Sequence, residues 1–385
     1  MTVCVHSNMP APHQLPMAGE LARWLGAKNF AFVHTERLSD ERIRVGWAQS
    51  SEPWVVASYD NPDLAQSWLE QSSFLLSGER DFRLFDRRVN RRGLITAYGS
   101  ERWFKPLSFT LFGREFEISG FWRMLFPKYI KMAYRMTRLL RQESFYYWAY
   151  GIHAATDMAR LVGLFSGDVR CLFSAPRLSV ERVPCGRVRI RGAKRHWDSK
   201  LAQMRIWGYS VEPSSAKVEA QVRGGMGNDI SVLWVGRMLC WKRLDTLVKA
   251  VAGLKCLHLD IYGAGPCERL LRKLARKNDN IVFHGFVPIG RVRELMREHD
   301  VYVMPSGAGE GWGAVVNECL EEGVPVLGTY EAGSSATILP EGCLFHAGDW
   351  RRLRSMLQKP IPVCEIGPWS AEALAKAIRR FCDER

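Results

Sequence analysis

The chain has 385 residues, of which 47% are hydrophobic and 24% charged, and its formal net charge is +14. This length predicts two globular domains, and the ten cysteines contain no C-x-x-C pair, which argues against a disulfide framework or a zinc site and for a reducing compartment. The start lacks a basic stretch followed by an apolar run, and the longest apolar stretch free of Asp, Glu, Lys and Arg, residues 144–156, is too short to span a bilayer, so we expect a cytoplasmic protein.

The positive charge is concentrated in two segments. Residues 79–143 carry a net charge of +8 and residues 182–205 a net charge of +7, so the rest of the chain is close to neutral. A basic first half suggests a negatively charged partner, such as anionic lipid, nucleic acid or a phosphorylated substrate.

The first half predicts an α/β domain over residues 1–207. A helix is expected at 19–26, and short β-rich runs predict strands at 2–7, 29–35, 54–60, 73–78 and 93–99. Residues 208–228 are rich in Gly, Ser and Pro and are expected to link two domains.

Residues 121–141 have the pattern of an amphipathic helix. One face carries Lys128, Lys131, Arg135 and Arg138. The apolar residues roughly opposite are Tyr129, Met132, Ala133, Met136 and Leu139. With Trp122 and Phe126 beside it, this segment suits an anionic membrane surface; packing on the sheet with the basic side outward explains the same pattern equally well.

The second half alternates strands with helices. Strands are expected at 230–236, 257–263, 280–287, 301–305 and 324–329, with helices at 244–254, 268–278, 290–299 and from near Gly313. This alternation predicts a parallel, doubly wound sheet over residues 229–365, followed by a closing helix within 366–385.

Two glutamates follow the strand at 301–305, where a parallel sheet binds ligands. Glu310 precedes Gly311 and Gly313, which let the backbone turn sharply and approach a ligand closely. The helix that follows directs its free N–H groups at the same space and favours an anion there. Glu318 lies eight positions on, roughly 12 Å along a helix. This spacing suits an extended ligand with hydroxyls at each end and an anion between them, such as a nucleotide sugar.

Two cations follow the first strand of the same domain. Arg237 comes directly after Gly236, and Lys242 lies five positions further on. A guanidinium and an ammonium at the carboxyl edge of the sheet suit a diphosphate, because they neutralise charge that develops on a leaving group. Taken alone, each of these charged residues is more often an ordinary surface charge; their occurrence on one rim favours a binding site.

Several ordered segments between 230 and 340 resemble the donor-binding domain of retaining GT-B glycosyltransferases, in particular family 4. They are "GRMLCWKRLD", "LDIYGAGP", "NIVFHGFVP" and "VYVMPSGAGEGWGAVVNECLEEGVPVLGT". The resemblance implies two Rossmann-like doubly wound domains that face each other across a cleft, with the closing helix crossing back to the first domain. It also implies transfer of a hexosyl group from a nucleoside-diphosphate sugar to an acceptor hydroxyl, without metal or cofactor.

The resemblance implies a role for each site residue. Glu310 contacts the hydroxyls of the transferred sugar, Glu318 holds the ribose, and Arg237 with Lys242 grips the diphosphate. Glycines 236 and 263 belong to the same loops. The backbone of Gly311, Trp312 and Gly313 meets the sugar, and the loop at Phe286 and Val287 meets the base.

The first half of the chain departs from this family or resembles it more weakly. Residues 6–16 lack the glycine pair that family members often carry after the first strand, and weaker matches near 94–106 and 208–214 resemble bacterial enzymes of surface polysaccharide assembly. His6, His13 and His153 are candidates for touching the sugar or activating the acceptor, although a lone histidine is more often structural. The expected partners are a carbohydrate or lipid-linked acceptor and an anionic membrane surface.

Other functions are compatible with the same fold. A nucleotide-sugar epimerase or a phosphorylase uses GT-B architecture for different chemistry. A further alternative is a non-catalytic protein that binds nucleic acid through its basic first half and keeps a vestigial sugar site. Residues 121–141 match no nucleic-acid-binding motif, so no nucleic-acid partner is expected.

Overall fold

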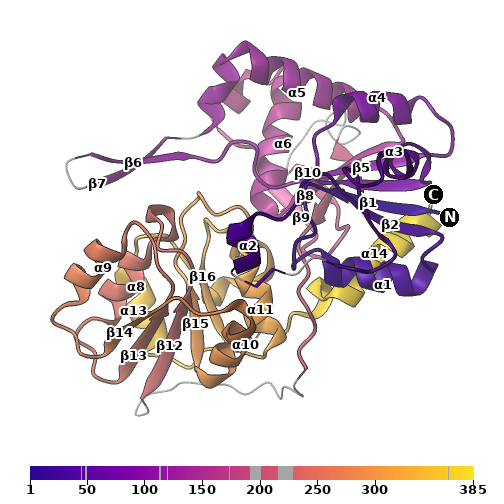
Figure 1. The fold of residues 1–385 in the computed structure, drawn as a ribbon. Helices are drawn as coiled ribbons and strands as arrows, with labels where there is room; N and C mark the ends of the chain where they lie inside the picture. Colours follow the sequence, from indigo (N-terminus) through magenta and orange to yellow (C-terminus); the bar gives the residue numbers. More distant parts are fainter. Residues whose placement is uncertain are drawn as a thin grey trace.

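The computed structural model describes residues 1–385 except 45, 48–49, 112–113, 119, 173, 191–200, 216–228 and 363. The chain forms two α/β domains, each with its own parallel sheet and hydrophobic core (Figure 1). Two doubly wound domains were expected from the sequence, and the structure confirms them.

The N-terminal sheet has seven parallel strands in the order β3-β2-β1-β4-β5-β8-β11. They are β1 (Val3–Ser7), β2 (Phe30–His34), β3 (Val55–Ala57), β4 (Phe74–Ser77), β5 (Ile95–Ser100), β8 (Phe145–Tyr150) and β11 (Met204–Trp207). The helices are α1 (Leu15–Leu25), α2 (Asp40–Arg44), α3 (Pro62–Gln71), α4 (Phe82–Val89), α5 (Pro127–Leu139) and α6 (Ile152–Leu164). Every residue of β1, β2, β4, β8 and β11 is buried, as expected for parallel strands covered on both faces.

Small strand pairs and single helical turns complete this domain. β6 (Leu107–Leu111) and β7 (Arg114–Ile118) form a hairpin that projects from its body (Figure 1). The remaining elements are β9 (Leu178–Val180), β10 (Val188–Ile190), η1 (Gly120–Leu125) and η2 (Val169–Leu172). The hairpin was not predicted from the sequence.

The C-terminal sheet has six parallel strands in the order β14-β13-β12-β15-β16-β17. They are β12 (Ile230–Val235), β13 (Leu257–Tyr262), β14 (Ile281–Gly285), β15 (Val301–Met304), β16 (Val326–Thr329) and β17 (Leu344–Phe345). The helices are η3 (Cys240–Lys242), α8 (Leu244–Val251), α9 (Glu268–Ala275), α10 (Ile289–Glu298), α11 (Val315–Glu321), α12 (Gly333–Ile338), η4 (Glu341–Cys343), α13 (Trp350–Leu357) and η5 (Gly367–Trp369). The chain reverses its strand order between β12 and β15, and such a switch point opens a crevice at the carboxyl edge of the sheet.

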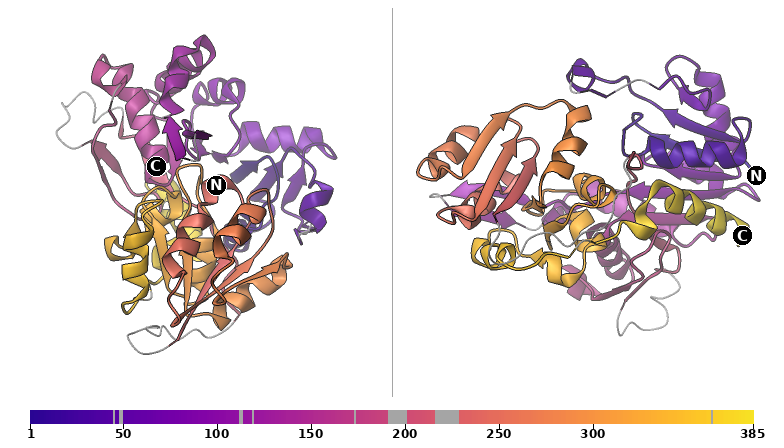
Figure 2. Two further views of the ribbon diagram at one scale, coloured as in Figure 1. Left: turned by 90° about the vertical axis from the view of Figure 1, so that its left-hand side faces the viewer. Right: turned by 90° about the horizontal axis from the view of Figure 1, so that it is seen from below.

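The last helix, α14 (Ala371–Asp383), lies on the N-terminal domain. It packs beside α1 (Figure 2). Phe381 of this helix contacts the rings of Phe74 and Trp148 in the N-terminal core. Ser370 caps this helix by accepting a hydrogen bond from the backbone N–H of Ala373. Both chain termini therefore lie on the first domain.

The segment that joins the two domains and the segment before α5 each have a feature that the sequence did not predict. The region expected as a linker begins inside the fold: Ser210 and Val211 are buried, and Gly208 packs so closely on Trp312 that an added Cβ would lie 2.5 Å from its ring. The rest of that region, 216–228, lies outside the described residues. The helix expected over 121–141 is divided at Pro127 into η1 and α5, because proline has no N–H to continue the preceding turns.

Candidate functional site

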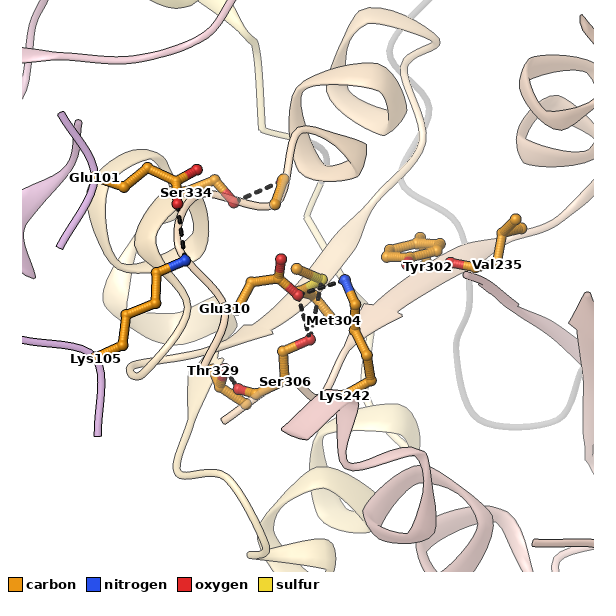
Figure 3. Close-up of polar contacts among 11 residues, drawn as sticks. Glu101, Lys105, Val235, Lys242, Tyr302, Met304, Ser306, Glu310, Thr329 and Ser334 are labelled. Carbon is orange, nitrogen blue, oxygen red and sulfur yellow. Dashed lines mark hydrogen bonds and ion pairs between the residues drawn. The ribbon is translucent and has the colours of Figure 1, made fainter. Parts of the chain in front are cut away.

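A short chain of polar side chains occupies the switch point of the C-terminal sheet. The Lys242 ammonium, at the end of η3, lies 2.5 Å from the Glu310 carboxylate, which follows β15. The Ser306 hydroxyl donates to the same carboxylate at 3.1 Å, and Thr329 of β16 donates to the Ser306 carbonyl (Figure 3). Loops after three neighbouring strands thus hold Glu310 in one orientation.

Glycines shape the loop between Glu310 and α11. Gly313 has φ +88°, and an added Cβ there would also lie 2.3 Å from Met304. Ser334 of α12 donates to the Gly313 carbonyl at 2.9 Å, and Gly333 lies so close to the Gly311 carbonyl that an added Cβ would be 2.0 Å away. The helix begins at Val315, two residues later than expected, since the backbone from 311 to 314 makes this turn first.

Close backbone packing also places the loop that carries Arg237. An added Cβ at Gly263 would lie 1.9 Å from the Gly236 carbonyl oxygen, and Met238 and Ala264 are joined by a backbone hydrogen bond of 2.9 Å. The Arg237 side chain is exposed and, within the described part of the chain, has no hydrogen-bond or ion-pair partner. It is therefore a cation available to a ligand at the edge where Lys242 lies.

Glu318 lies one turn into α11 and is half-buried. Burial raises the pKa of its carboxyl, Arg293 opposes this, and Glu322 adds to it. At the far side of the sheet, Phe286 is exposed and Val287 is half-buried in the loop after β14. The predicted donor-site residues thus all lie in loops or a helix at the carboxyl edge of one sheet.

A cavity of about 380 Å³ opens at the carboxyl edge of the N-terminal sheet. Its walls come from the ends of β1, β5 and β8, from the loops that follow β1, β4, β5 and β11, and from the segment that contains α2 and Trp47. Tyrosine and tryptophan side chains line it together with four cations, Arg42, Arg80, Arg102 and Lys105. The position mirrors that of the crevice in the other domain, and sequence reasoning predicted no cavity there.

Glu101 joins this cavity to the C-terminal site. It lines the cavity directly after β5, accepts a hydrogen bond from Lys105 at 3.0 Å, and lies against Gly311, where an added Cβ would be 1.8 Å from its carboxylate oxygen (Figure 3). Tyr209 donates to its other oxygen at 3.4 Å. Sequence reasoning missed Glu101, although a carboxylate two residues past the strand expected at 93–99 is the kind of signal that singled out Glu310.

The three histidine candidates have different surroundings. His153, at the start of α6, donates through Nε2 to the Tyr330 carbonyl of the other domain at 2.7 Å. His13 lines the N-terminal cavity and packs edge-on against Tyr209, whereas His6 is buried and bonded to Ser77. Burial lowers the pKa of each imidazole to about 4. The catalytic role expected for His153 stays a prediction.

Further contacts hold the two domains face to face. The backbone N–H of Ile152 donates to the Thr337 hydroxyl at 3.1 Å, and the Asn317 amide donates to the Tyr209 carbonyl at 3.1 Å. Asn317 in turn accepts from the Trp312 indole at 2.9 Å, so the ring of Trp312, expected at the donor site, is buried between the domains. The crevice and the cavity therefore meet at Gly311.

The predicted lipid-facing segment has an unexpected arrangement. The apolar side chains Ala133, Met136 and Leu139 are buried in the N-terminal core, and Arg135 and Arg138 both pair with Asp86. A second apolar row remains exposed at four-residue spacing, and its members are Trp122, Phe126, Ile130 and Tyr134. No helix of the described residues is both long enough and apolar enough to cross a membrane.

Comparison with solved structures defines the class of fold as GT-B. The chain superposes over its whole length on the Anabaena protein HepE in complex with UDP and glucose, with a TM-score of 0.56, 10% identity and 100% of that chain covered. It also superposes on the lipopolysaccharide outer core galactosyltransferase WaaB, with a TM-score of 0.54 and 12% identity over 99% of this chain and 95% of the other. At such low sequence identity the two superpositions show the fold alone. The expectation of two facing Rossmann-like domains is confirmed.

The family model of the glycosyl transferases group 1 matches residues 229–359, the segment that contains Glu310 and Lys242. A curated relative, the phosphatidyl-myo-inositol mannosyltransferase of Mycobacterium leprae (strain TN), is 27% identical over 244 residues. The match covers 60% of this chain and 62% of that relative.

Proposed function

We propose that the protein is a retaining glycosyltransferase of family 4, which transfers a hexosyl group from a nucleoside-diphosphate sugar to an acceptor hydroxyl. The observation that carries the proposal is the Lys242–Glu310 pair at the switch point of the group 1 domain, beside the exposed Arg237 and facing the N-terminal cavity across Gly311. The names of similar proteins support it: one is a mannosyltransferase, one a galactosyltransferase, and one was solved with UDP-glucose.

Each charged residue has a role in this proposal. Glu310 accepts hydrogen bonds from the sugar hydroxyls, and Glu318 accepts them from the ribose. As the bond between the sugar and the diphosphate breaks, negative charge builds up on the diphosphate, and Lys242 and Arg237 stabilise it. The acceptor oxygen bonds to the anomeric carbon on the face that the diphosphate leaves, and the proton of the acceptor hydroxyl passes to the departing diphosphate. No protein nucleophile is assigned, and neither a metal nor a cofactor is proposed.

We further propose that the enzyme acts in polysaccharide or glycolipid assembly on the cytoplasmic face of a membrane. Support comes from the exposed row Trp122, Phe126, Ile130 and Tyr134, which has the basic residues Arg123 and Lys128 beside it. Apolar side chains insert at the lipid interface, and cations contact anionic head groups. Flotation with liposomes tests this: binding to anionic but not to neutral vesicles supports it, and equal recovery with both contradicts it.

The donor is tested with a thermal-shift panel of UDP-, GDP- and ADP-sugars. A ligand that binds only the folded state raises the melting temperature, and UDP-sugars are the first expectation because HepE was solved with UDP. Incubation of the stabilising donor with and without candidate acceptors then separates a transferase from an epimerase. An epimerase converts the donor without an acceptor, and that result would contradict the proposal.

A further inference from the structure

Two arginine–tryptophan pairs line the N-terminal cavity. The Arg80 guanidinium lies 4.8 Å from the ring centre of Trp103, and the Arg42 guanidinium lies 4.7 Å from that of Trp47. All four side chains belong to the cavity wall. Stacking on an aromatic face holds a guanidinium in one plane while its N–H edge remains open to a ligand.

These two arginines have no carboxylate partner, unlike the other cations of the wall. Lys105 pairs with Glu101 at 3.0 Å, and Arg102 lies 3.6 Å from the buried carboxylate of Asp157. Arg80 donates to the Tyr98 hydroxyl at 3.3 Å and to the Met132 sulfur, and within the described residues neither Arg80 nor Arg42 forms an ion pair. The cavity therefore has an uncompensated positive charge.

The remaining wall is suited to a carbohydrate. Indole and phenol rings pack against the apolar faces of sugar rings, and Trp47, Trp103 and Tyr209 supply such rings here. The side-chain oxygen of Gln14 is buried at this wall without a hydrogen-bond partner among the described residues. A buried acceptor without a partner is costly, and a ligand hydroxyl would satisfy it.

We propose that this cavity binds a sugar acceptor through a negatively charged group, a phosphate or a carboxylate, held by Arg80 and Arg42. The inference rests on the proposed function, because the acceptor must place its hydroxyl where Glu101 and Gly311 bring the two domains together. The charged group is recognised by paired N–H donors of the guanidinium, as is usual for carboxylates and phosphates. The enzyme thus selects its acceptor by charge in addition to shape.

The first test measures binding of small probes to the full-length protein saturated with UDP, which occupies the donor site. Glucose 6-phosphate and glucuronic acid are compared with neutral glucose by isothermal titration. We expect both anionic sugars to bind at least tenfold more tightly than glucose. Equal affinity for all three would overturn the proposal. Failure of UDP itself to bind would instead count against the proposed function, so the two failures are distinguishable.

The second test uses matched variants. Arg80→Gln and Arg42→Gln should each remove most of the preference for the anionic sugars, whereas Arg83→Gln should keep it, because Arg83 is exposed nearby at the start of α4 and lies outside the cavity wall. Arg80→Lys should retain part of the preference, since the positive charge remains but the paired N–H donors of the guanidinium are lost. Circular dichroism and UDP affinity establish that each variant is folded. A preference that survives in Arg80→Gln contradicts the inference.

A further arm distinguishes the source of the anion. Vesicles of phosphatidylcholine with 20% phosphatidylinositol compete with glucose 6-phosphate if the anion belongs to a lipid head group, and they do not compete if it belongs to a soluble sugar. Competition and no competition both support an anionic acceptor, provided that Arg80→Gln abolishes binding of the vesicles in the first case and of glucose 6-phosphate in the second. Binding of sugar and vesicle that is unaffected by this substitution overturns the proposal.

Discussion

Lys242 and Glu310 are 68 positions apart in the sequence, and each neutralises the charge of the other in the structure. Both side chains are largely buried, with 22% and 13% of their surface exposed, so their interaction is less screened by solvent than that of a surface pair. In the proposed reaction, the donor supplies hydroxyls to Glu310 and negative charge to Lys242. The pair therefore holds both side chains in place before a donor arrives.

Replacement of either member should abolish most of the transfer reaction. We expect Lys242→Met and Glu310→Gln each to lower kcat/KM by at least about 100-fold, the size of effect seen when a group that stabilises transition-state charge is removed. Initial rates with the stabilising donor and an identified acceptor measure this.

Lys249→Met provides the matched control, because Lys249 pairs with Asp245 on the surface of the same domain. Its activity should equal that of the wild type, and circular dichroism should show that all three variants are folded. Unchanged turnover in Lys242→Met would show that the assigned role is wrong.

Gly263 illustrates how a residue without a side chain determines the donor site. It has φ +127°, and its neighbour, the Gly236 carbonyl, leaves no room for a Cβ. We expect Gly263→Ala to lower the free energy of unfolding by more than about 2 kcal/mol, because strain and a backbone clash add. Gly253→Ala is the control, since its φ is also positive but no atom lies within 4 Å of an added Cβ. Unfolding of both variants in guanidinium chloride measures the difference. An equal loss of unfolding free energy in the two variants would contradict the explanation.

At the scale of secondary structure, Arg88 joins several N-terminal elements. This fully buried side chain of α4 donates to the carbonyls of Leu69 and Ser72 at the end of α3, and to the Ile95 carbonyl and Thr96 hydroxyl of β5. Desolvation lowers the pKa of its guanidinium to about 10, so it stays charged at neutral pH. One charged residue thus positions the strand that precedes Glu101.

Arg88→Met should leave several buried carbonyl groups without a donor. We expect a loss of about 3–5 kcal/mol in the free energy of unfolding, as for other broken buried networks. Arg87→Met, a neighbouring exposed substitution, should cost under about 1 kcal/mol. Urea denaturation followed by tryptophan fluorescence compares them. A small effect in Arg88→Met would show that water replaces these contacts.

The sequence was most informative about elements whose pattern is local. Strands such as 301–304 follow from a short β-rich run ending at Pro305, and Glu310 and Arg237 could be singled out because each lies a few residues beyond the end of such a strand. The hairpin β6–β7 was not predictable, because it depends on pairing between two weak strands. The buried residues after β11 were not predictable either, because they are buried by contacts with the other domain. Glu101 follows an expected strand, but its contact with Gly311 was not predictable, because only the packed domains bring the two residues together.

For the whole molecule, the relation between the two domains depends on a few buried contacts at the cleft. His153 is the most instructive, because its hydrogen bond to Tyr330 requires a protonated Nε2 and burial keeps the ring neutral. The depressed pKa of about 4 means that the unfolded chain binds a proton at higher pH than the native state does. The stability that His153 contributes is therefore present above pH 6.5 and declines as the pH falls toward 4.

Acid should therefore destabilise the folded protein partly through this residue. Between pH 7 and pH 5 we expect His153 to account for a loss of up to about 2 kcal/mol in the free energy of unfolding. His153→Gln keeps a donor for the Tyr330 carbonyl but cannot be protonated, so its stability should decline less over the same range. Denaturation curves at pH 7, 6 and 5 measure the difference between the two proteins. Parallel declines would contradict the neutral, buried state of His153.

The central claim is that the crevice at the switch point of the C-terminal sheet binds the nucleotide sugar. Hydrogen exchange of the backbone amides, with and without the donor that stabilises the protein, tests it most directly. The account predicts protection concentrated in residues 236–243 and 310–318, and its loss in Lys242→Met at the same donor concentration. Protection confined to other surfaces, with these two loops unchanged, would contradict it.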